Sequence, residues 1–359
     1  MRLKQFSNTL TTIALSSLLA VSAQAATIQL GGRIHVDYSQ GDDGADDTED
    51  FEFRRVRLAA KGDVAEDWRF KVQVEFDTDA EDFDAGDDTA ATNENDAEET
   101  DFKDVYFRYR GFGNMANITV GQQKEPFSLQ ALTSSNDITL LSTSPTIGLL
   151  SANDRNLGVQ VQGSDGTFHY GAGIFRDKRE TRKGGSKDIL WALTGRAAYS
   201  PINDEDQVVH IALGITDREG GDYGSHTNGI NLEGAWVTGP FSVQGEITRG
   251  EIGSNDAEGL YVQGAWTLTG ERRPYKGGKF KRIKPQQAVA WEVAARLFGQ
   301  SVDADTGGDI DTDGFALGIN AYIGNQVKIG AQYIDADTDA PGQRSIDTDE
   351  FRLRGQLVF

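Results

Sequence analysis

Cysteine is absent from this chain of 359 residues, and proline (7) and histidine (4) are scarce. Without cysteine, the chain cannot form disulfide bridges or thiolate metal sites. The histidines, at positions 35, 169, 210 and 226, show neither the spacing of metal ligands nor that of a catalytic triad. We therefore expect no metal, no cofactor and no enzymatic activity, and an outer-membrane hydrolase is the alternative from the enzyme class.

Long apolar runs are also lacking. After the N-terminal segment, no stretch of the chain approaches the ~18 apolar residues of a membrane-spanning helix. A transmembrane β-barrel lacks such runs too, because its strands alternate lipid-facing and lumen-facing residues. The net charge of −21 argues against nucleic-acid binding and for a highly solvated surface. These observations leave a soluble β-protein and a membrane barrel as alternatives.

The N-terminus has the three parts of a secretory signal. Arg2 and Lys4 are followed by the apolar stretch 13–21 and by the small-residue sequence Ala23-Gln24-Ala25. We expect residues 1–25 to be a signal peptide and residues 26–359 to form one exported domain.

Strict alternation of apolar and polar residues continues along the rest of the chain. In WRFKVQVEFD (68–77), five large apolar residues on one strand face oppose five polar or charged residues on the other. About sixteen such segments follow one another, and short turns alternate with long loops, except for a long connection at 271–287. The pattern predicts an all-β fold: a closed antiparallel transmembrane β-barrel of about sixteen strands.

The last segment alternates to the final residue, Phe359. A terminal aromatic strand of this kind resembles the C-terminal signature of outer-membrane barrels. It supports a location in the outer membrane of a Gram-negative bacterium.

One stretch, 120–154, interrupts the alternation. Pro126 ends a strand, and about thirty irregular residues follow that are too apolar to be disordered. We expect this loop to fold inward as a constriction that is held to the wall by its apolar residues. The side chains predicted to face the passage are Ser128, Thr133, Ser134, Ser135 and Asn136.

Basic residues dominate the strand faces that alternation assigns to the lumen. They include Arg33, Arg55, Arg57, Lys61, Arg69, Lys71, Arg108, Arg110, Lys124, Arg196, Arg296, Lys328, Arg352 and Arg354. The acids on these faces are fewer: Asp37, Glu75, Asp104, Glu233, Glu246 and Glu292. A net basic bore favours anions. In the alternative, these arginines only pair with lumen acids and line a passive pore.

Three segments together resemble the family of phosphate-selective porins O and P. They are FEFRRVRLAAKGDVAEDWRFKVQVEFD (51–77), DVYFRYRGFGNMANITVGQQKEPFSLQALTSS (104–135) and WTLTGERRPYKGGKFKRIKP (266–285), and the stretch 318–334 also fits. The resemblance implies a sixteen-stranded trimeric porin with an inward loop after the fifth strand. The positions that match basic residues of the family are Arg33, Arg55, Arg57 and Lys124.

Two further loops bear on selectivity. The loop after the ninth strand holds only Arg218, and residues 126–154 contain neither lysine nor arginine. We therefore expect anion preference without strict phosphate selectivity. The periplasmic connection at 271–287 is strongly basic, and we expect Arg272, Arg273, Lys281 and Arg282 to form a second anion funnel there or else to lie in a solvated loop.

The remaining acidic stretches, 42–50, 78–101, 303–313 and 335–350, are expected to be outer loops. DIDTDG (309–314) resembles the first half of a calcium loop, although the position of the usual twelfth-residue glutamate is Asn320. More generally, these carboxylates would share diffuse divalent ions with lipopolysaccharide.

The sequence therefore predicts an outer-membrane porin for passive diffusion of small solutes, with anions such as phosphate favoured. The expected partners are outer-membrane lipid and lipopolysaccharide, small anionic solutes and two further copies in a homotrimer, and nucleic acid is excluded. A general porin with weak or cation selectivity is the alternative, and a barrel blocked by its own loop would serve as an adhesin.

Overall fold

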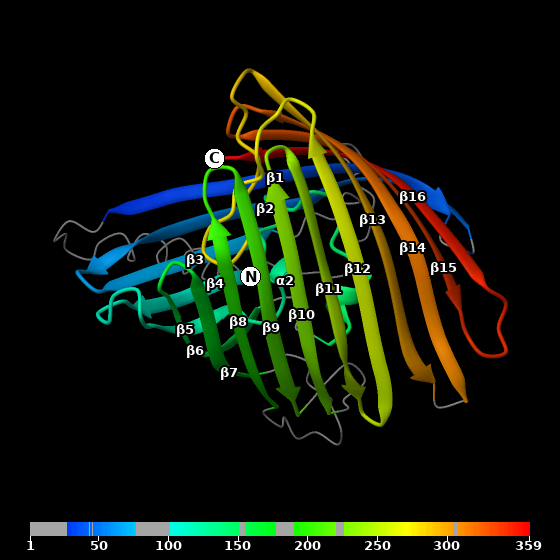
Figure 1. Cartoon of the computed structure of the whole chain (residues 1–359), viewed down its shortest axis with the longest axis horizontal. Helices are drawn as coiled ribbons and strands as arrows, with labels where there is room; N and C mark the ends of the chain where they lie inside the picture. The colour runs from blue at the N-terminus through cyan, green and yellow to red at the C-terminus, as the bar shows by residue number, and fades with distance from the viewer. Residues whose placement is uncertain are drawn as a thin grey trace, which may run out of the picture.

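Figure 1 shows a computed structural model of the chain, which describes residues 27–42, 44, 46–76, 101–150, 155–176, 190–219, 226–304 and 307–359. The expected signal peptide and most of the acidic stretch 78–101 lie outside these residues. The strands are β1 (Ile28–Asp42), β2 (Asp47–Ala65), β3 (Trp68–Phe76), β4 (Asp101–Tyr109), β5 (Asn117–Lys124), β6 (Arg155–Ser164), β7 (Phe168–Arg176), β8 (Trp191–Asn203), β9 (Gln207–Arg218), β10 (Thr227–Thr238), β11 (Phe241–Ile252), β12 (Asn255–Thr267), β13 (Val289–Ala304), β14 (Gly308–Ile323), β15 (Val327–Asp339) and β16 (Ile346–Val358). Two short helices, α2 (Leu129–Leu132) and η2 (Pro145–Gly148), lie between β5 and β6.

The sixteen strands form one closed antiparallel barrel, in which each strand pairs with its neighbours in sequence and β1 pairs with β16. The prediction of the fold class is confirmed. At the seam, the Gly32 amide donates to the Phe359 carbonyl over 2.8 Å, and the Phe359 amide donates to the Gly32 carbonyl over 3.2 Å. Closure leaves no unpaired edge along the barrel, as a sheet surrounded by lipid requires.

The two faces of each strand have different surroundings. In β9, Ile211, Leu213 and Ile215 are exposed on the outer face, whereas His210 and Thr216 are buried on the inner face. The same alternation runs through β8, β10, β11 and β12. Polar residues are therefore inside and apolar residues outside, the reverse of a water-soluble protein. No helix in the described part of the chain is long and apolar enough to cross a membrane.

Aromatic side chains gather on the outer surface near the end of the barrel with short turns. Trp68 lies 5.0 Å from Tyr109 between ring centroids, and Phe168 lies 4.6 Å from Tyr199. Phe241 and Trp266 stack at 5.6 Å beside the next short turn. Aromatic side chains gathered on the outer surface near one end are typical of the girdle that a membrane barrel places at the lipid–water interface.

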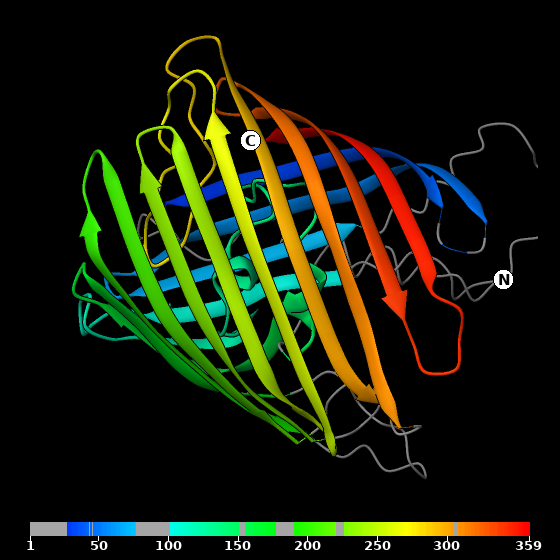
Figure 2. The same cartoon turned by 45° about the vertical axis from the view of Figure 1, so that its right-hand side comes forward.

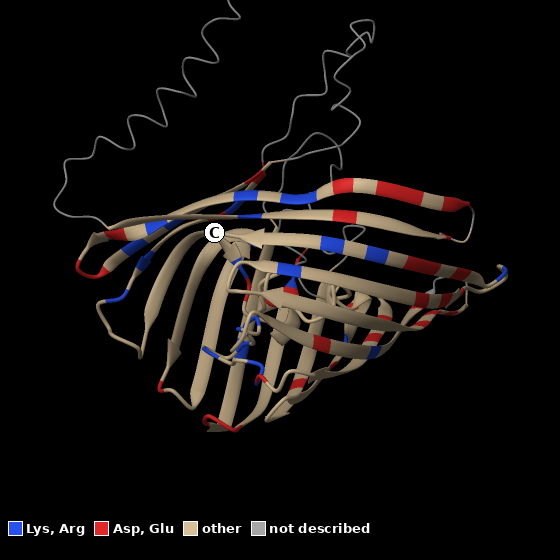
Figure 3. Ribbon diagram, turned by 90° about the horizontal axis from the view of Figure 1, so that it is seen from above, with Lys and Arg blue, Asp and Glu red and all other residues tan. Residues whose placement is uncertain are grey.

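Several acidic stretches form strands, so the prediction of loops there was wrong. Residues 47–50 lie in β2, 308–313 in β14, 335–339 in β15 and 346–350 in β16, and β1 and β13 reach positions 42 and 304. Figure 3 shows Asp and Glu gathered toward one end of these long strands. Residues 309–314 lie in β14, so they are not the calcium loop that their sequence resembles. Extending the hairpins pairs backbone groups that a loop would leave open, despite the low β-propensity of aspartate.

We predict that Leu213→Arg, near the middle of the outer face of β9, destabilises the barrel in phospholipid vesicles by about 2–4 kcal/mol, because the charge faces hydrocarbon. Val64→Arg, on the exposed bulge beside the β2–β3 turn, should cost only about 0–1 kcal/mol. Urea unfolding in vesicles measures both. Equal costs at the two positions would mean that β9 does not face lipid.

Candidate functional site

The irregular stretch after β5 lies inside the barrel (Figure 2). Residues 125–150, here called the inward segment, leave the wall at Glu125, whose carboxylate pairs with buried Arg218 at the end of β9. The same carboxylate accepts hydrogen bonds from the Asn156 amide at 2.7 Å and the Thr194 hydroxyl at 2.5 Å. Pro126 then prevents the strand from continuing. Arg218 therefore holds the base of the inward segment, and it is not part of the loop after the ninth strand as the sequence suggested.

The helical turn α2 is fixed at its N-terminus by two side chains. The Ser128 hydroxyl accepts from the Ala131 amide at 3.1 Å, and the Glu246 carboxylate of β11 accepts from the Leu129 and Gln130 amides at 3.1 and 2.9 Å. A serine N-cap and a carboxylate both satisfy the open amides of a first turn. Ser128 is consequently buried, and the expectation that it faces the passage was wrong.

Wall cations hold the second half of the inward segment by its backbone carbonyls. Lys328 of β15 donates to the carbonyls of Ile138 and Thr139, both at 3.0 Å. Arg354 of β16 donates to Leu141 at 2.6 Å, and Arg296 of β13 donates to Ser142 at 3.0 Å. These three residues were predicted as bore cations, and the structure gives each of them an anchoring contact.

Asn136 is also directed at the wall. Its side-chain oxygen contacts His35 Nε2 at 3.1 Å, and its carbonyl accepts from Gln356 at 3.3 Å. The side chain is only 9% exposed. The prediction that Asn136 faces the passage was therefore wrong, because its side-chain amide contacts a buried imidazole of the wall.

A second segment enters the barrel from the end with short turns. Residues 268–288, the long connection between β12 and β13, are here called the second inward segment. Tyr275 and Phe280 pack with Leu129 of α2 and with Val208 and Val237 of the wall. The Tyr275 hydroxyl also contacts His210 Nδ1 at 2.6 Å. The two inward segments therefore form one packed body against β9 and β10.

The basic residues of the second inward segment separate into two groups. Arg273 is buried, donates to Gln244 at 2.6 Å and lies 4.1 Å from the centre of the Phe280 ring. Arg282 donates to the Val327 carbonyl at 2.9 Å. Lys279 and Lys281 line the interior cavity instead, whereas Arg272, Arg273 and Arg282 do not line it. Of the four residues predicted to form a second funnel or a solvated loop, only Lys281 lies at the cavity.

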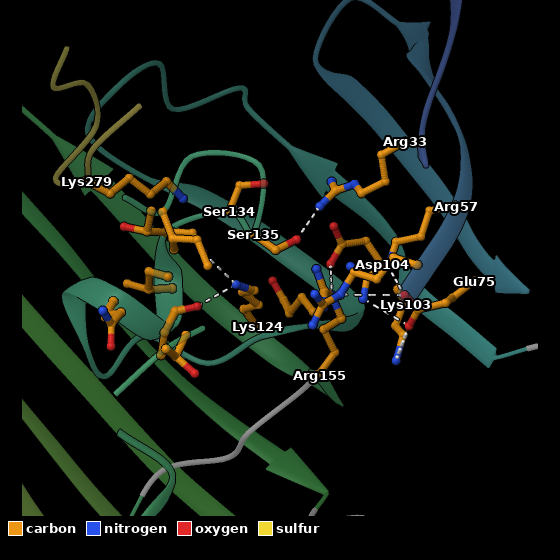
Figure 4. A pocket seen from close by; sticks show the side chains of 18 of the residues that line it. Arg33, Arg57, Glu75, Lys103, Asp104, Lys124, Ser134, Ser135, Arg155 and Lys279 are labelled. Carbon is orange, nitrogen blue, oxygen red and sulfur yellow. Dashed lines mark hydrogen bonds and ion pairs between the residues drawn. The ribbon is translucent and has the colours of Figure 1, made fainter. Parts of the chain in front are cut away.

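The cavity left beside this body measures ≈ 700 Å³ and is lined mainly by β1–β6, β16 and the two inward segments. Thirteen lysine or arginine side chains line it, against two carboxylates, Glu75 and Asp104. Figure 4 shows Arg33, Arg57 and Arg155 on the strand side, Lys279 on the opposite side and Ser134 and Ser135 between them. The cavity is strongly basic although the whole chain is acidic.

Each of the two carboxylates is shared between cations. Glu75 accepts from Arg57 at 2.5 and 2.9 Å and pairs with Lys103 at 2.8 Å. Asp104 accepts from Arg155 at 2.7 Å and also pairs with Lys71. The two acids therefore cannot neutralise the lining, which keeps an excess of positive charge.

Other lining cations bind neutral oxygens of the inward segment. The Arg33 guanidinium donates to the Ser135 hydroxyl at 2.7 Å. Lys124 Nζ donates to the carbonyls of Ala131 at 2.5 Å and Thr133 at 3.1 Å. These contacts fix the positions of the two charges without cancelling them.

Lys279 titrates closer to neutrality than an ordinary lysine. Burial, and then the positive charges of Lys281, Arg196 and Arg108, lower the pKa of its ammonium group to about 8. The cations around the cavity are therefore crowded enough to destabilise one another's charge.

The structure brings twelve of the predicted residues to the cavity. They are Arg33, Arg55, Arg57, Lys71, Arg108, Lys124, Thr133, Ser134, Ser135, Lys281, Arg352 and Arg354. Among the predicted constriction residues in this set, Thr133 is mostly buried, because its hydroxyl donates to the Leu129 carbonyl at 2.8 Å.

The other predicted strand residues lie elsewhere. Lys61 and Arg69 are exposed, and Arg69 and Arg110 both pair with Asp63 near the β2–β3 turn, at 2.9 and 2.8 Å. Arg196 is buried against Glu233 and donates to the Gly278 carbonyl at 3.1 Å. Strand parity placed these residues on the correct face but did not give their depth along the barrel.

Sequence reasoning missed four lining cations, Arg54, Lys103, Arg155 and Lys279. The ladder shifts register between Val72 and Val74 and between His35 and Asp37, so Lys103 and Arg54 lie beside bulges that break the alternation. Arg155 opens β6 opposite Lys124, just after the stretch predicted to be a loop. Lys279 stood in the basic connection, but nothing in the sequence singled it out from its neighbours.

Comparison with known proteins identifies the family of this chain. The family described as phosphate-selective porin O and P matches residues 28–218 and 215–359. The chain is 27% identical to Porin O of Pseudomonas aeruginosa, with 95% of this chain and 90% of that protein covered.

Solved structures share the fold at low sequence identity. An anion-selective porin from Comamonas acidovorans has a TM-score of 0.65 at 13% identity, with 93% of this chain and 100% of that chain covered. The outer membrane channel DcaP of Acinetobacter baumannii has a TM-score of 0.60 at 13% identity, with 94% and 99% covered. The fold is that of channels of the outer membrane. The chain belongs to the family of phosphate-selective porins O and P, and it is an outer-membrane porin of a Gram-negative bacterium.

Proposed function

We propose that this porin passes small solutes by passive diffusion through the basic cavity and favours anions. The observation that carries the proposal is the excess of thirteen cationic over two anionic side chains in the cavity lining. Fixed charges in a narrow bore with low-dielectric walls concentrate counter-ions and admit them preferentially. The Porin O relative and the anion-selective porin from Comamonas acidovorans support the same assignment. We propose no catalytic role.

The inward segment is the proposed constriction. It fills the barrel beside β9–β15 and leaves the cavity against the basic wall of β1–β6. Ser134 and Ser135 lie between the cations of the two sides and offer hydroxyl groups to a passing anion (Figure 4). The inward segment itself contributes no cation, so we expect general anion preference instead of strict selectivity for phosphate.

The proposal also covers the membrane environment of the barrel and its oligomeric state. The apolar outer face and aromatic girdle would contact outer-membrane lipid and lipopolysaccharide, after removal of residues 1–25 as a signal peptide. We propose a homotrimer, which the trimer form of OmpT of Vibrio cholerae, a fold neighbour with a TM-score of 0.57, supports.

A porin with weak or cation preference is the second candidate, because the protruding strands oppose carboxylates across the ladder. Asp337 of β15 lies directly opposite Asp347 of β16, and Asp335 lies opposite Asp349. Such a rim would repel incoming anions at low ionic strength, where screening is weak.

The zero-current potential in a KCl gradient across a planar bilayer decides between the two candidates. We predict that chloride is favoured, because the lining charges attract it. Arg33→Ala combined with Arg55→Ala should lower the chloride-to-potassium permeability ratio by roughly two- to fivefold, equivalent to about 0.4–1 kcal/mol of lost attraction.

The matched control is Arg69→Ala combined with Arg110→Ala, which removes two guanidinium groups outside the cavity. This pair should leave the ratio unchanged. A wild-type channel that prefers potassium would overturn the proposed function.

Lys279 gives the anion preference a pH dependence. Its ammonium is charged below its pKa of about 8 and neutral above it, so the chloride-to-potassium ratio should fall as the pH rises from about 7 to about 9. Lys279→Arg keeps the charge and should remove this transition. An unchanged transition in Lys279→Arg would assign it to another group.

The anchoring role of Lys328 is separable from a role in attracting anions. Lys328→Met removes the donor to the Ile138 and Thr139 carbonyls, and hydrogen bonds from charged groups contribute roughly 1.5–3 kcal/mol. We predict larger and noisier single-channel currents at a similar permeability ratio. Lys61→Met, an exposed lysine outside the cavity, is the control. Quiet currents with a reduced ratio would instead make Lys328 an anion-attracting residue.

A further inference from the structure

The cavity has two unlike faces. Its strand face carries the arginines and lysines of β1–β6, whereas the lining residues that the inward segment contributes between positions 130 and 148 are all uncharged. Asp137 of the same stretch does not line the cavity and pairs with Lys281 at 3.6 Å. This second face includes Ala131 and Leu132, which are both half-buried. A bore that served only hydrated inorganic ions would have no use for an apolar surface opposite its cations.

Leu132 is held in this position by the turn of α2. Its amide donates to the Ser128 carbonyl at 3.0 Å, and the next amide, of Thr133, donates to Leu129 at 3.0 Å. Leu129 is fully buried in an apolar cluster, whereas Leu132 belongs to none of the buried clusters in the described part of the chain. Part of the Leu132 side chain therefore meets water in the cavity, at a cost that an apolar ligand would remove.

A cation lies directly beside this leucine. Lys124 Nζ donates to the carbonyls of Ala131 and Thr133, the residues on either side of Leu132. An ammonium group has three donors, so these two contacts leave one for an anion. Positive charge and apolar surface are thus adjacent and fixed by the same hydrogen bonds.

We propose that the cavity binds organic carboxylates with a hydrocarbon chain of several carbons, with the carboxylate on Lys124 and the chain along Leu132 and Ala131. The cavity volume of ≈ 700 Å³ falls in the range of about 300–1,000 Å³ that is usual for sites of small organic ligands. This inference rests on the proposed function and narrows its solutes to a chemical class.

Acetate, butyrate and hexanoate test the class, because they share the carboxylate and differ only in chain length. Each is added to a single channel carrying chloride current, and the concentration that halves the current is measured, with inorganic phosphate for comparison. Burial of each added methylene against Leu132 should strengthen block by roughly twofold, so hexanoate, with four more methylenes, should act at a concentration about sixteenfold lower than acetate.

Leu132→Ser should abolish the dependence on chain length and leave block by acetate and phosphate unchanged. Leu30→Ser, at a highly exposed position on the outer surface, is the matched control and should behave as wild type. Because Leu132 lies outside the buried clusters, its replacement leaves the packed body intact.

The KCl gradient separates failure of this inference from failure of the proposed function. A channel that prefers chloride but is blocked equally by acetate and hexanoate would overturn the carboxylate site and leave the proposed function standing. A channel that prefers potassium would overturn both. Chain-length dependence that persists in Leu132→Ser would also overturn the site.

Discussion

The closure of the sheet between β1 and β16 is the constraint on which the rest of the structure depends. A strand in hydrocarbon has no water for its backbone groups, so every amide must find a partner within the sheet. The seam at Gly32 and Phe359 meets this requirement at the chain's own C-terminus. Closure then forces every second side chain into the interior, where polar residues must be hydrated or bonded to one another. The interior chemistry of this porin is therefore a consequence of how the barrel closes.

On one side of the barrel, the two inward segments provide the packing and hydrogen-bond partners that interior side chains require. They cover the inner face of β9–β15 with packed apolar residues such as Leu129 and Phe280, and with hydrogen bonds to Glu246 and Lys328. The remaining inner face, on β1–β6, stays open and carries most of the cavity's cations. Filling half of the barrel thus concentrates the charge in a cavity much narrower than the whole barrel.

The sequence was sufficient to predict the barrel, its strand number and the inward position of residues 125–150, because alternation and turn signals are local. Depth and fine register were not predictable in this way. Bulges in β1–β4 placed Lys103 and Arg54 at the cavity against strict alternation, and a one-residue slip reverses the face of a side chain. Ser128 and Asn136 were misassigned because a helix cap and a buried imidazole, both set by tertiary contacts, claimed their polar groups.

The way in which the cations are held explains how an acidic protein keeps a positive bore. A carboxylate would fix a lysine or arginine but would also cancel its charge, as Asp37 does for Arg354. A backbone carbonyl fixes the same group through its dipole and adds no opposite charge to the bore. Lys124 is held in this way by the carbonyls of Ala131 and Thr133, and Arg33 is held by the hydroxyl of Ser135. Neutral oxygens of the inward segment therefore suit the proposed anion channel better than carboxylates at the same places, because they order Lys124 and Arg33 without neutralising them.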